Sequence, residues 1–223
     1  MVNREIFIAG GTGYVGQRLI PELLSRGHNV RALTRKGSEG RLPAGCTPVI
    51  GNALDKSTFA SQVRPGDTYV QLVGVAHPSP SKASQFRSID LVSARESISA
   101  AVEAGVGHFV YVSVAHPAPA MKAYIEVRSE VEDMIGASGL KATILRPWYV
   151  LGPGHHWPYL LVPTYWVMER FPRTRDTARR LGLVTLRQMV CALVHSVQSP
   201  PEGTNGVRIV EVPEIRELGG KML

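Results

Sequence analysis

Short apolar runs alternate along most of the chain with segments in which apolar residues recur at helical spacing. The apolar runs predict strands at residues 6–9, 28–35, 48–51, 68–75, 108–114, 141–145 and 207–212. Spacings of three and four residues predict helices at 17–26, 86–104, 124–137 and 185–198, with a short one near 58–63. Strands that alternate with helices pair in parallel, with right-handed crossovers. The pattern therefore predicts an α/β fold built on a doubly wound parallel sheet of about seven strands.

The alternation breaks down after residue 152. Residues 155–183 are rich in proline and aromatic side chains and include a basic run at 170–180. We interpret residues 153–184 as a small substrate lobe inserted in a single domain that spans residues 1–223. The basic run lacks interleaved aromatics and any nucleic-acid reader motif, so we expect a small-molecule substrate and no nucleic-acid partner.

Composition narrows the class of protein further. No apolar run approaches the roughly 20 residues that cross a membrane, and no signal peptide precedes the first strand, so we expect a cytoplasmic protein with no membrane partner. Cys46 and Cys191 stand in apolar surroundings without metal-like or redox-like spacing, which predicts reduced, buried thiols and no metal site. The formal net charge of +7 fits an anionic ligand, but it equally fits a basic surface.

A glycine-rich turn joins the first predicted strand to the first predicted helix. Gly10, Gly13 and Gly16 have the spacing G-x-x-G-x-x-G. Glycine allows a sharp turn and lets a pyrophosphate approach the backbone amides, and the following helix N-terminus offers unpaired N–H groups to the phosphates. A tight turn without a ligand needs fewer glycines than this. The turn therefore predicts a dinucleotide-binding site.

The end of the second predicted strand bears on the choice of dinucleotide. An NAD site usually carries Asp or Glu there, to bind the ribose 2′-hydroxyl. This chain has Thr34, Arg35 and Lys36 instead, with Glu39 a little further on as a weak opposing signal. A guanidinium can bind a 2′-phosphate through two hydrogen bonds, whereas a carboxylate repels it. We therefore predict NADP(H) rather than NAD(H).

Three segments together resemble the short-chain dehydrogenase/reductase superfamily: residues 10–16, the strand end at 112–113, and Arg146-Pro147 with the Gly-Pro-Gly of 152–154. The chain is most similar to the extended and atypical branch, which includes NAD(P)-dependent epimerase/dehydratase-like proteins and NmrA-like NAD(P)-binding proteins. The resemblance covers residues 4–154 well and the remainder thinly. It implies a Rossmann-like fold with a small C-terminal substrate lobe, and it makes a homodimer through the long helices possible.

The resemblance also implies where a dinucleotide binds. Residues 10–16 would hold the pyrophosphate, Asn52 the adenine amino group, residues 73–75 the adenosine ribose, and residues 147–150 the nicotinamide. The implied cofactor-binding residues are Gly10, Thr12, Gly13, Tyr14, Val15, Gly16, Arg35, Asn52, Ala53, Val73, Gly74, Val75, Pro147 and Val150.

The catalytic residues that the resemblance implies are Ser113, Tyr124 and Arg128. The family places Ser or Thr at the end of the fifth strand and a Tyr four residues before a Lys, which brings the last two to one helix face. A tyrosine of pKa ~10 needs a nearby cation to exchange protons at neutral pH. Arg128 replaces the lysine, and a guanidinium supplies charge but cannot release its proton.

Three interpretations of Tyr124 stay open. It acts as an acid with Arg128 as the cation, it is a relic in a cofactor-binding protein, or it is a surface tyrosine whose Arg128 neighbour pairs with Glu126 or Glu130. Three functions follow. The first is an NADPH-dependent oxidoreductase of a small carbonyl-type or quinone-type substrate. The alternatives are a non-catalytic NADP(H)-binding redox sensor or assembly subunit, and a nucleotide-sugar epimerase or dehydratase.

Overall fold

A computed structural model describes residues 3–118, 120–152, 180–203 and 206–221 of the chain. Seven parallel strands form one sheet in the order β3-β2-β1-β4-β5-β6-β9. They are β1 (Glu5–Ala9), β2 (Asn29–Thr34), β3 (Thr47–Ile50), β4 (Thr68–Gln71), β5 (His108–Val112), β6 (Ala142–Arg146) and β9 (Val207–Glu211). A second, two-stranded parallel sheet pairs β7 (Tyr149–Leu151) with β8 (Leu183–Thr185). This arrangement confirms the predicted Rossmann-like, doubly wound fold.

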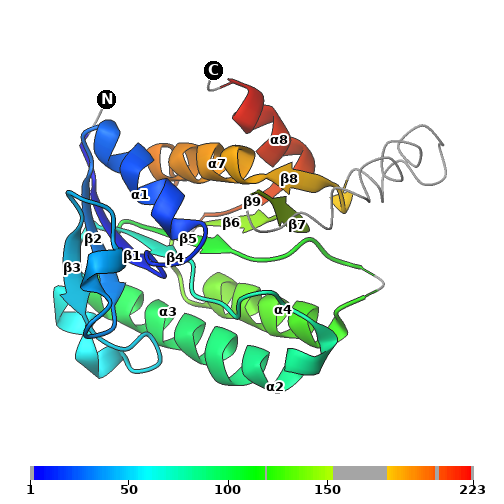
Figure 1. The fold of residues 1–223 in the computed structure, drawn as a ribbon, viewed down its shortest axis with the longest axis horizontal. Helices are drawn as coiled ribbons and strands as arrows, with labels where there is room; N and C mark the ends of the chain where they lie inside the picture. Colours follow the sequence, from blue (N-terminus) through cyan, green and yellow to red (C-terminus); the bar gives the residue numbers. More distant parts are fainter. Residues whose placement is uncertain (1–2, 119, 153–179, 204–205, 222–223) are drawn as a thin grey trace.

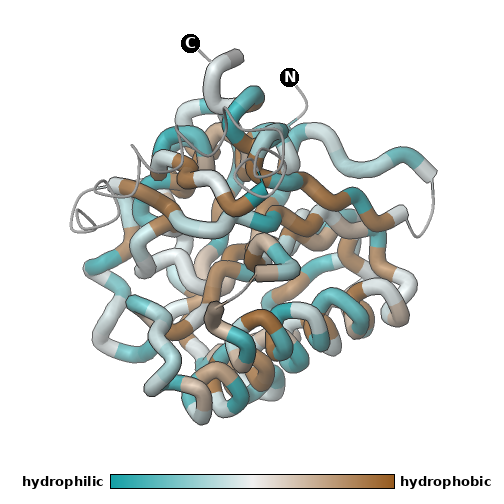
Figure 2. The backbone as a smooth tube through the Cα atoms, turned by 90° about the vertical axis from the view of Figure 1, so that its right-hand side faces the viewer, coloured by the Kyte–Doolittle hydropathy of each residue, from teal (hydrophilic) through white to brown (hydrophobic). Residues whose placement is uncertain are grey.

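Helices cover both faces of the seven-stranded sheet, as Figure 1 shows. One layer contains α1 (Gly16–Ser25), α7 (Leu186–Gln198) and α8 (Val212–Lys221), and the other contains α2 (Ala83–Gln85), α3 (Val92–Ala104) and α4 (Lys122–Ala137). The hydrophobic stretches of the chain gather in the middle of the molecule, between these layers (Figure 2).

Alternation along β1 divides the core into two clusters. Ile6 and Ile8 pack toward α1 and α7, whereas Phe7 and Ala9 pack toward α3 and α4. The Phe7 ring lies 5.1 Å from that of Tyr69, which lies 5.3 Å from that of Phe109. Three neighbouring strands of the sheet thus present a row of aromatic side chains to one helix layer.

The predicted helix over 86–104 contains an irregular turn. Residues Phe86–Leu91 form a π-helical turn that leads directly into α3. From the spacing of apolar residues we expect Ile89, Val92, Ile98, Ala101 and Val102 to face the core. Ile98 and Ala101 are buried, as expected, whereas Val102 is 46% exposed. Small residues, including Ala94 and Ser97, take the inner face because the helix packs closely on the sheet.

Several other boundaries differ from the predictions. β4 ends at Gln71 rather than at 75, and the segment near 58–63 forms two 3-10 turns, Lys56–Thr58 and Ala60–Gln62. The helix α8 was not predicted. Cys46 and Cys191 are half-buried, so the prediction of buried thiols was wrong.

Most of the predicted substrate lobe, residues 153–179, lies outside the described residues, so the division into a domain with an inserted lobe stays a prediction. Across the described part of the chain, no helix combines the length and the apolar character that a membrane span needs.

Candidate functional site

A cleft of about 370 Å³ opens at the carboxyl ends of β1, β2 and β4. Ligands of open parallel sheets bind at this edge, where the strand order reverses on either side of the first strand. The cleft is lined by Gly10, Thr12, Gly13, Leu33, Thr34, Arg35, Ser38, Gly51, Asn52, Ala53, Leu54, Leu72, Val73, Gly74 and Ile89.

The glycine turn forms one wall of the cleft, and two of its positions leave no room for a side chain. Gly10 has φ +92°, and a Cβ on it would lie 2.8 Å from the backbone carbon of Leu72. A Cβ on Gly16 would lie 2.5 Å from the carbonyl oxygen of Gly10. Gly13 donates its N–H to that same carbonyl at 3.0 Å, which closes the turn three residues before α1 begins.

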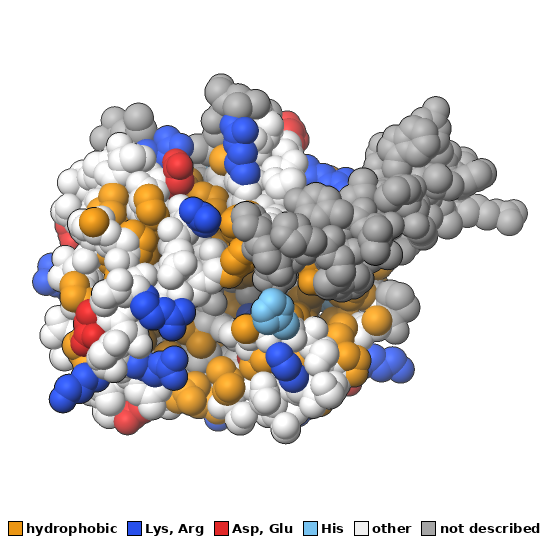
Figure 3. Space-filling model, viewed as in Figure 1, with side chains coloured by type: hydrophobic (Ala, Val, Ile, Leu, Met, Phe, Trp, Pro, Cys, Tyr) orange, Lys and Arg blue, Asp and Glu red, His pale blue; other side chains and the backbone are white. Residues whose placement is uncertain are grey.

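Arg35 provides a positive charge in the cleft. It lies at the end of β2 and is the only charged side chain among the described residues that line the cleft. Glu39 lies in the following turn and is not part of the lining. The face in Figure 3 carries more Lys and Arg than Asp and Glu, in keeping with the net charge of +7. The cleft therefore favours an anionic ligand near Arg35.

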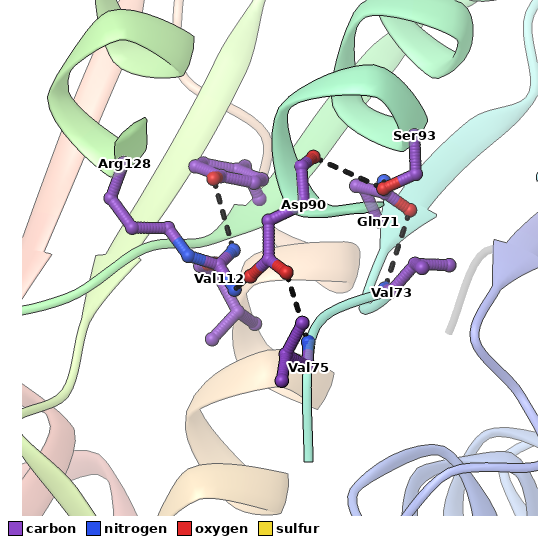
Figure 4. Close-up of polar contacts among 8 residues, drawn as sticks. Gln71, Val73, Val75, Asp90, Ser93, Val112 and Arg128 are labelled. Carbon is purple, nitrogen blue, oxygen red and sulfur yellow. Dashed lines mark hydrogen bonds and ion pairs between the residues drawn. The ribbon is translucent and has the colours of Figure 1, made fainter. Parts of the chain in front are cut away.

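Side chains hold the backbone that leaves β4 along the cleft (Figure 4). The N–H of Val73 donates to Gln71 Oε1 at 3.4 Å, and the N–H of Val75 donates to Asp90 Oδ2 at 3.0 Å. Gln71 Nε2 donates to the hydroxyl of Ser93 at 3.3 Å. These hydrogen bonds hold residues 73–75 in place after β4 has ended.

Arg128 lies beneath this segment rather than on the surface. Its Nη2 donates to Asp90 Oδ1 at 2.6 Å, and its Nη1 donates to the Tyr111 hydroxyl at 3.0 Å and the Val112 carbonyl at 2.9 Å. The pairing of Arg128 with Glu126 or Glu130, which belonged to the third of the three open interpretations of Tyr124, is therefore wrong. Those two carboxylates lie near Arg87 instead.

Burial and the ion pair act in opposite directions on the pKa values of Asp90 and Arg128. Burial raises the pKa of Asp90, while the Arg128 charge and the Val75 N–H oppose that rise. Burial alone would lower the pKa of Arg128, but Tyr111, Tyr124 and Asp90 hold it above its ordinary value. Burial also raises the pKa of Tyr111 to about 12, so this phenol stays protonated.

The other two predicted catalytic residues lie on different parts of this framework. Ser113, just after β5, is buried and donates its hydroxyl proton to Glu132 of α4. Tyr124, near the start of α4, is half-buried, and its ring centroid lies 4.9 Å from the Arg128 guanidinium carbon. Arg128 therefore lies at the ring of Tyr124, while Ser113 is tied to a carboxylate that sequence reasoning did not single out.

The structure brings most of the predicted cofactor-binding residues to one place. Eight of them line the cleft: Gly10, Thr12, Gly13, Arg35, Asn52, Ala53, Val73 and Gly74. Tyr14, Val15, Gly16, Val75, Pro147 and Val150 are not part of its lining. Pro147 accepts the Ala115 N–H at 3.0 Å, and Val150 pairs with Val184 in the small sheet.

The predicted cofactor-binding residues did not include seven that line the cleft: Leu33, Thr34, Ser38, Gly51, Leu54, Leu72 and Ile89. Sequence reasoning also missed Asp90, which holds Val75 and Arg128 behind the lining. One signal for Asp90 was present. Asp90 lies four residues after Phe86 and four residues before Ala94, and both of these residues are buried. This spacing places its carboxylate on an apolar face of the helix. A carboxylate there needs a cationic or N–H partner.

Comparison with known proteins places this geometry in context. A family model described as NAD(P)H-binding matches residues 10–156. A 3-diazoavenalumate denitrifying reductase of Streptomyces is 28% identical over 67% of this chain and 57% of its own length. A Bacillus subtilis protein named as an uncharacterized sugar epimerase, YhfK, is 29% identical over 64% of this chain and 71% of its own length. In the first three curated relatives, the match spans only 31% to 57% of the relative's length.

The fold has close counterparts among solved structures. The Bordetella bronchiseptica enzyme WbmH, in complex with NAD+, superposes with a TM-score of 0.67 over 98% of this chain and 80% of its own, at 22% identity. A short-chain dehydrogenase/reductase superfamily protein of Agrobacterium tumefaciens with bound NAD gives 0.68 over 93% and 77%, at 16% identity. At such identities the likeness concerns the fold.

Proposed function

The chain belongs to the NAD(P)H-binding family, and from this premise we propose that it is an NADPH-dependent oxidoreductase of the short-chain dehydrogenase/reductase type, acting on a small carbonyl-type or quinone-type substrate. One observation carries the proposal. The cleft at the carboxyl edge of the sheet combines a glycine turn, which would leave room for a pyrophosphate, with Arg35, the one charged side chain among the described residues of its lining.

The residues of the cleft suit such a dinucleotide. Gly10 and Gly13 would leave room for phosphates just before the start of α1, where the positive end of the helix dipole favours anions. Asn52 and Ala53 line the part of the cleft beyond β3 and would border the adenine. A nicotinamide bound in this manner supplies or accepts a hydride.

Arg35 and Ser38 support NADP(H) over NAD(H). Both line the cleft at the end of β2, where a guanidinium and a hydroxyl can donate hydrogen bonds to a 2′-phosphate. In the part of the chain that the structure describes, no carboxylate lines the cleft to bind a 2′-hydroxyl or to repel the phosphate.

In the reductive direction, Tyr124 would donate a proton to the substrate oxygen. The Arg128 guanidinium lies over the Tyr124 ring, 4.9 Å from the ring centroid. Ser113 would orient the same oxygen. Its hydroxyl carries one proton, which is donated to Glu132, so it has to turn away from Glu132 before it donates to a carbonyl.

A second function, an NADP(H)-binding redox sensor, is favoured by the same contacts. Arg128 makes three internal hydrogen bonds, and Ser113 is held by Glu132, so both predicted catalytic partners of Tyr124 serve the fold. A sensor needs the cleft and Arg35 but no free Tyr–Ser pair.

NADPH oxidation with a panel of quinones, aldehydes and ketones separates the two functions. An oxidoreductase turns over at least one of them, and Tyr124→Phe lowers the turnover at least tenfold while the Kd for NADPH changes less than twofold. No turnover together with tight NADPH binding supports the sensor. Turnover that survives Tyr124→Phe contradicts the role given to the tyrosine. Interconversion of nucleotide sugars without net NADPH oxidation would instead favour an epimerase, the activity named for one relative.

A further inference from the structure

We propose that Asp90 is a positioning residue for the dinucleotide cleft, because its buried carboxylate joins Arg128 to the backbone of residues 73–75. We call these three residues the β4 exit segment. The inference rests on the proposed function in one respect, namely that the cleft holds a nicotinamide dinucleotide.

The two oxygens of Asp90 bind two different parts of the fold. Oδ2 accepts a hydrogen bond from the N–H of Val75 at 3.0 Å, and Oδ1 accepts one from Arg128 Nη2 at 2.6 Å. The other terminal nitrogen of Arg128 is bonded to Tyr111 and Val112, at the end of β5. One carboxylate, 1% exposed, therefore connects the β4 exit segment with α4 and with the end of β5.

The β4 exit segment depends on these side-chain contacts because the sheet no longer holds it. The last backbone hydrogen bond from this stretch to β1 joins the Leu72 N–H to the Ala9 carbonyl at 2.8 Å. Beyond it, the N–H groups of Val73 and Val75 go to the side chains of Gln71 and Asp90 (Figure 4). Fixed donors and acceptors of this kind set the path of a loop.

The π-helical turn at Phe86–Leu91 carries Asp90 into this position. Such turns interrupt regular helices and occur often at functional sites. The backbone carbonyl of Asp90 accepts the Ser93 hydroxyl at 3.1 Å, and Ser93 in turn accepts from Gln71. The turn thus presents the carboxylate to Val75 and, through Ser93 and Gln71, supports Val73.

Because Gly74 has no side chain, the Asp90–Arg128 ion pair lies directly against the backbone of the cleft wall. Gly74 lines the cleft, and a Cβ on it would lie 2.7 Å from Arg128 Nη2 and 3.2 Å from Asp90 Oδ1. The backbone of the cleft wall therefore rests on the charged groups themselves. A shift of the pair moves this wall.

A second buried Arg–Asp ion pair provides a control that separates positioning of the cleft from stability of the fold. Arg31 Nη2 lies 2.6 Å from Asp67 Oδ2, which also accepts the backbone N–H of Arg64 at 2.7 Å. Asp67 is 1% exposed, like Asp90. It stands just before β4, however, at the amino ends of the strands and therefore opposite the cleft.

The test compares Asp90→Asn with Asp67→Asn in the full chain, with the Kd for NADPH measured by fluorescence and the Tm by thermal unfolding. Both variants leave a buried arginine without its carboxylate, so we expect the Tm to fall in both. Asp90→Asn is expected to weaken NADPH binding at least tenfold, and Asp67→Asn less than twofold. Equal changes of Kd in the two variants, or no change with Asp90→Asn, would overturn the positioning role.

Gly74→Ala provides a second test that leaves both charges in place. Its methyl group has to displace the Arg128 guanidinium, so we expect at least fivefold weaker NADPH binding. Unchanged binding in this variant contradicts the inference.

The wild-type protein separates the failure of this inference from that of the proposed function. If it binds neither NADPH nor NADH, both are overturned. If it binds NADPH and the Asp90 and Gly74 variants bind equally well, only the positioning role is overturned.

Discussion

Ser113 donates its hydroxyl proton to the carboxylate of Glu132, which ties the end of β5 to the middle of α4. The same carboxylate accepts hydrogen bonds from Arg146, at the end of β6, and lies 3.5 Å from His116 Nε2. Glu132 therefore gathers three side chains from the carboxyl edge of the sheet. It gives that edge a fixed arrangement next to the residues proposed for catalysis.

We predict that Glu132→Ala lowers the free energy of unfolding by about 2–3 kcal/mol, because Arg146 loses a nearly buried partner and Ser113 an acceptor. Chemical denaturation measures this change. Glu130→Ala, two residues earlier on the same helix, is the control, since Glu130 is exposed and lies 3.6 Å from Arg87. Its cost should stay below about 1 kcal/mol. Equal costs for the two variants would show that Glu132 holds nothing together.

Two substitutions in the glycine turn should separate an effect on stability from an effect on NADPH binding. Gly16→Ala places a methyl group against the backbone of Gly10 and Gly11, which we expect to cost about 1–3 kcal/mol of stability. Gly13→Ala meets only the Gly10 carbonyl at 3.2 Å, so its stability should change little, while its methyl group narrows the phosphate site.

Thermal unfolding and NADPH titration of both variants test this distinction, with Gly40→Ala as the control, because a Cβ there meets no atom within 4 Å. A Gly13→Ala protein that binds NADPH as tightly as the wild type would speak against a pyrophosphate in the turn.

His108 predicts a pH dependence of stability. Burial lowers its pKa from 6.5 to about 3, with smaller contributions from Arg4 and Lys141. Between these values the unfolded chain binds a proton that the folded chain does not, so the contribution of His108 is complete above pH 6.5 and is lost as the pH falls toward 3. The slope is about 1.4 kcal/mol per pH unit.

His108→Gln keeps a hydrogen-bonding group toward Thr143, whose hydroxyl lies 2.9 Å from His108 Nε2, but it does not titrate. Unfolding free energies of wild type and variant, measured from pH 7 to pH 4, should therefore converge as the pH falls. Parallel curves would mean that His108 can be protonated in the folded state.

The sequence was sufficient to predict the fold because the strands and helices carry their periodicity locally. Neighbouring residues alone are enough to predict the strands β1 and β5 from their apolar runs and the turn before α1 from its glycines. The position of the cleft could be predicted from the same strands, since parallel strands bring residues as distant as Gly13, Arg35 and Gly74 to one edge of the sheet. Whether they bind a dinucleotide stays a prediction.

What could not be predicted depends on contacts between distant residues. Asp90 and Arg128 are 38 positions apart, and Ser113 and Glu132 are 19 apart. Periodicity identifies the helix that bears each residue, but it does not show which side chain a buried carboxylate meets. The π-helical turn that aims Asp90 at Val75 likewise has no local sequence signal of the kind that caps and glycines provide.

Titration of the protein with NADPH and with NADH, in the wild type and in Arg35→Ala, tests the central claim most directly. The account predicts that the wild type binds NADPH at least tenfold more tightly than NADH, and that Arg35→Ala removes most of this preference with little effect on NADH. Absence of binding to either nucleotide, or a preference for NADPH that Arg35→Ala leaves intact, would contradict it.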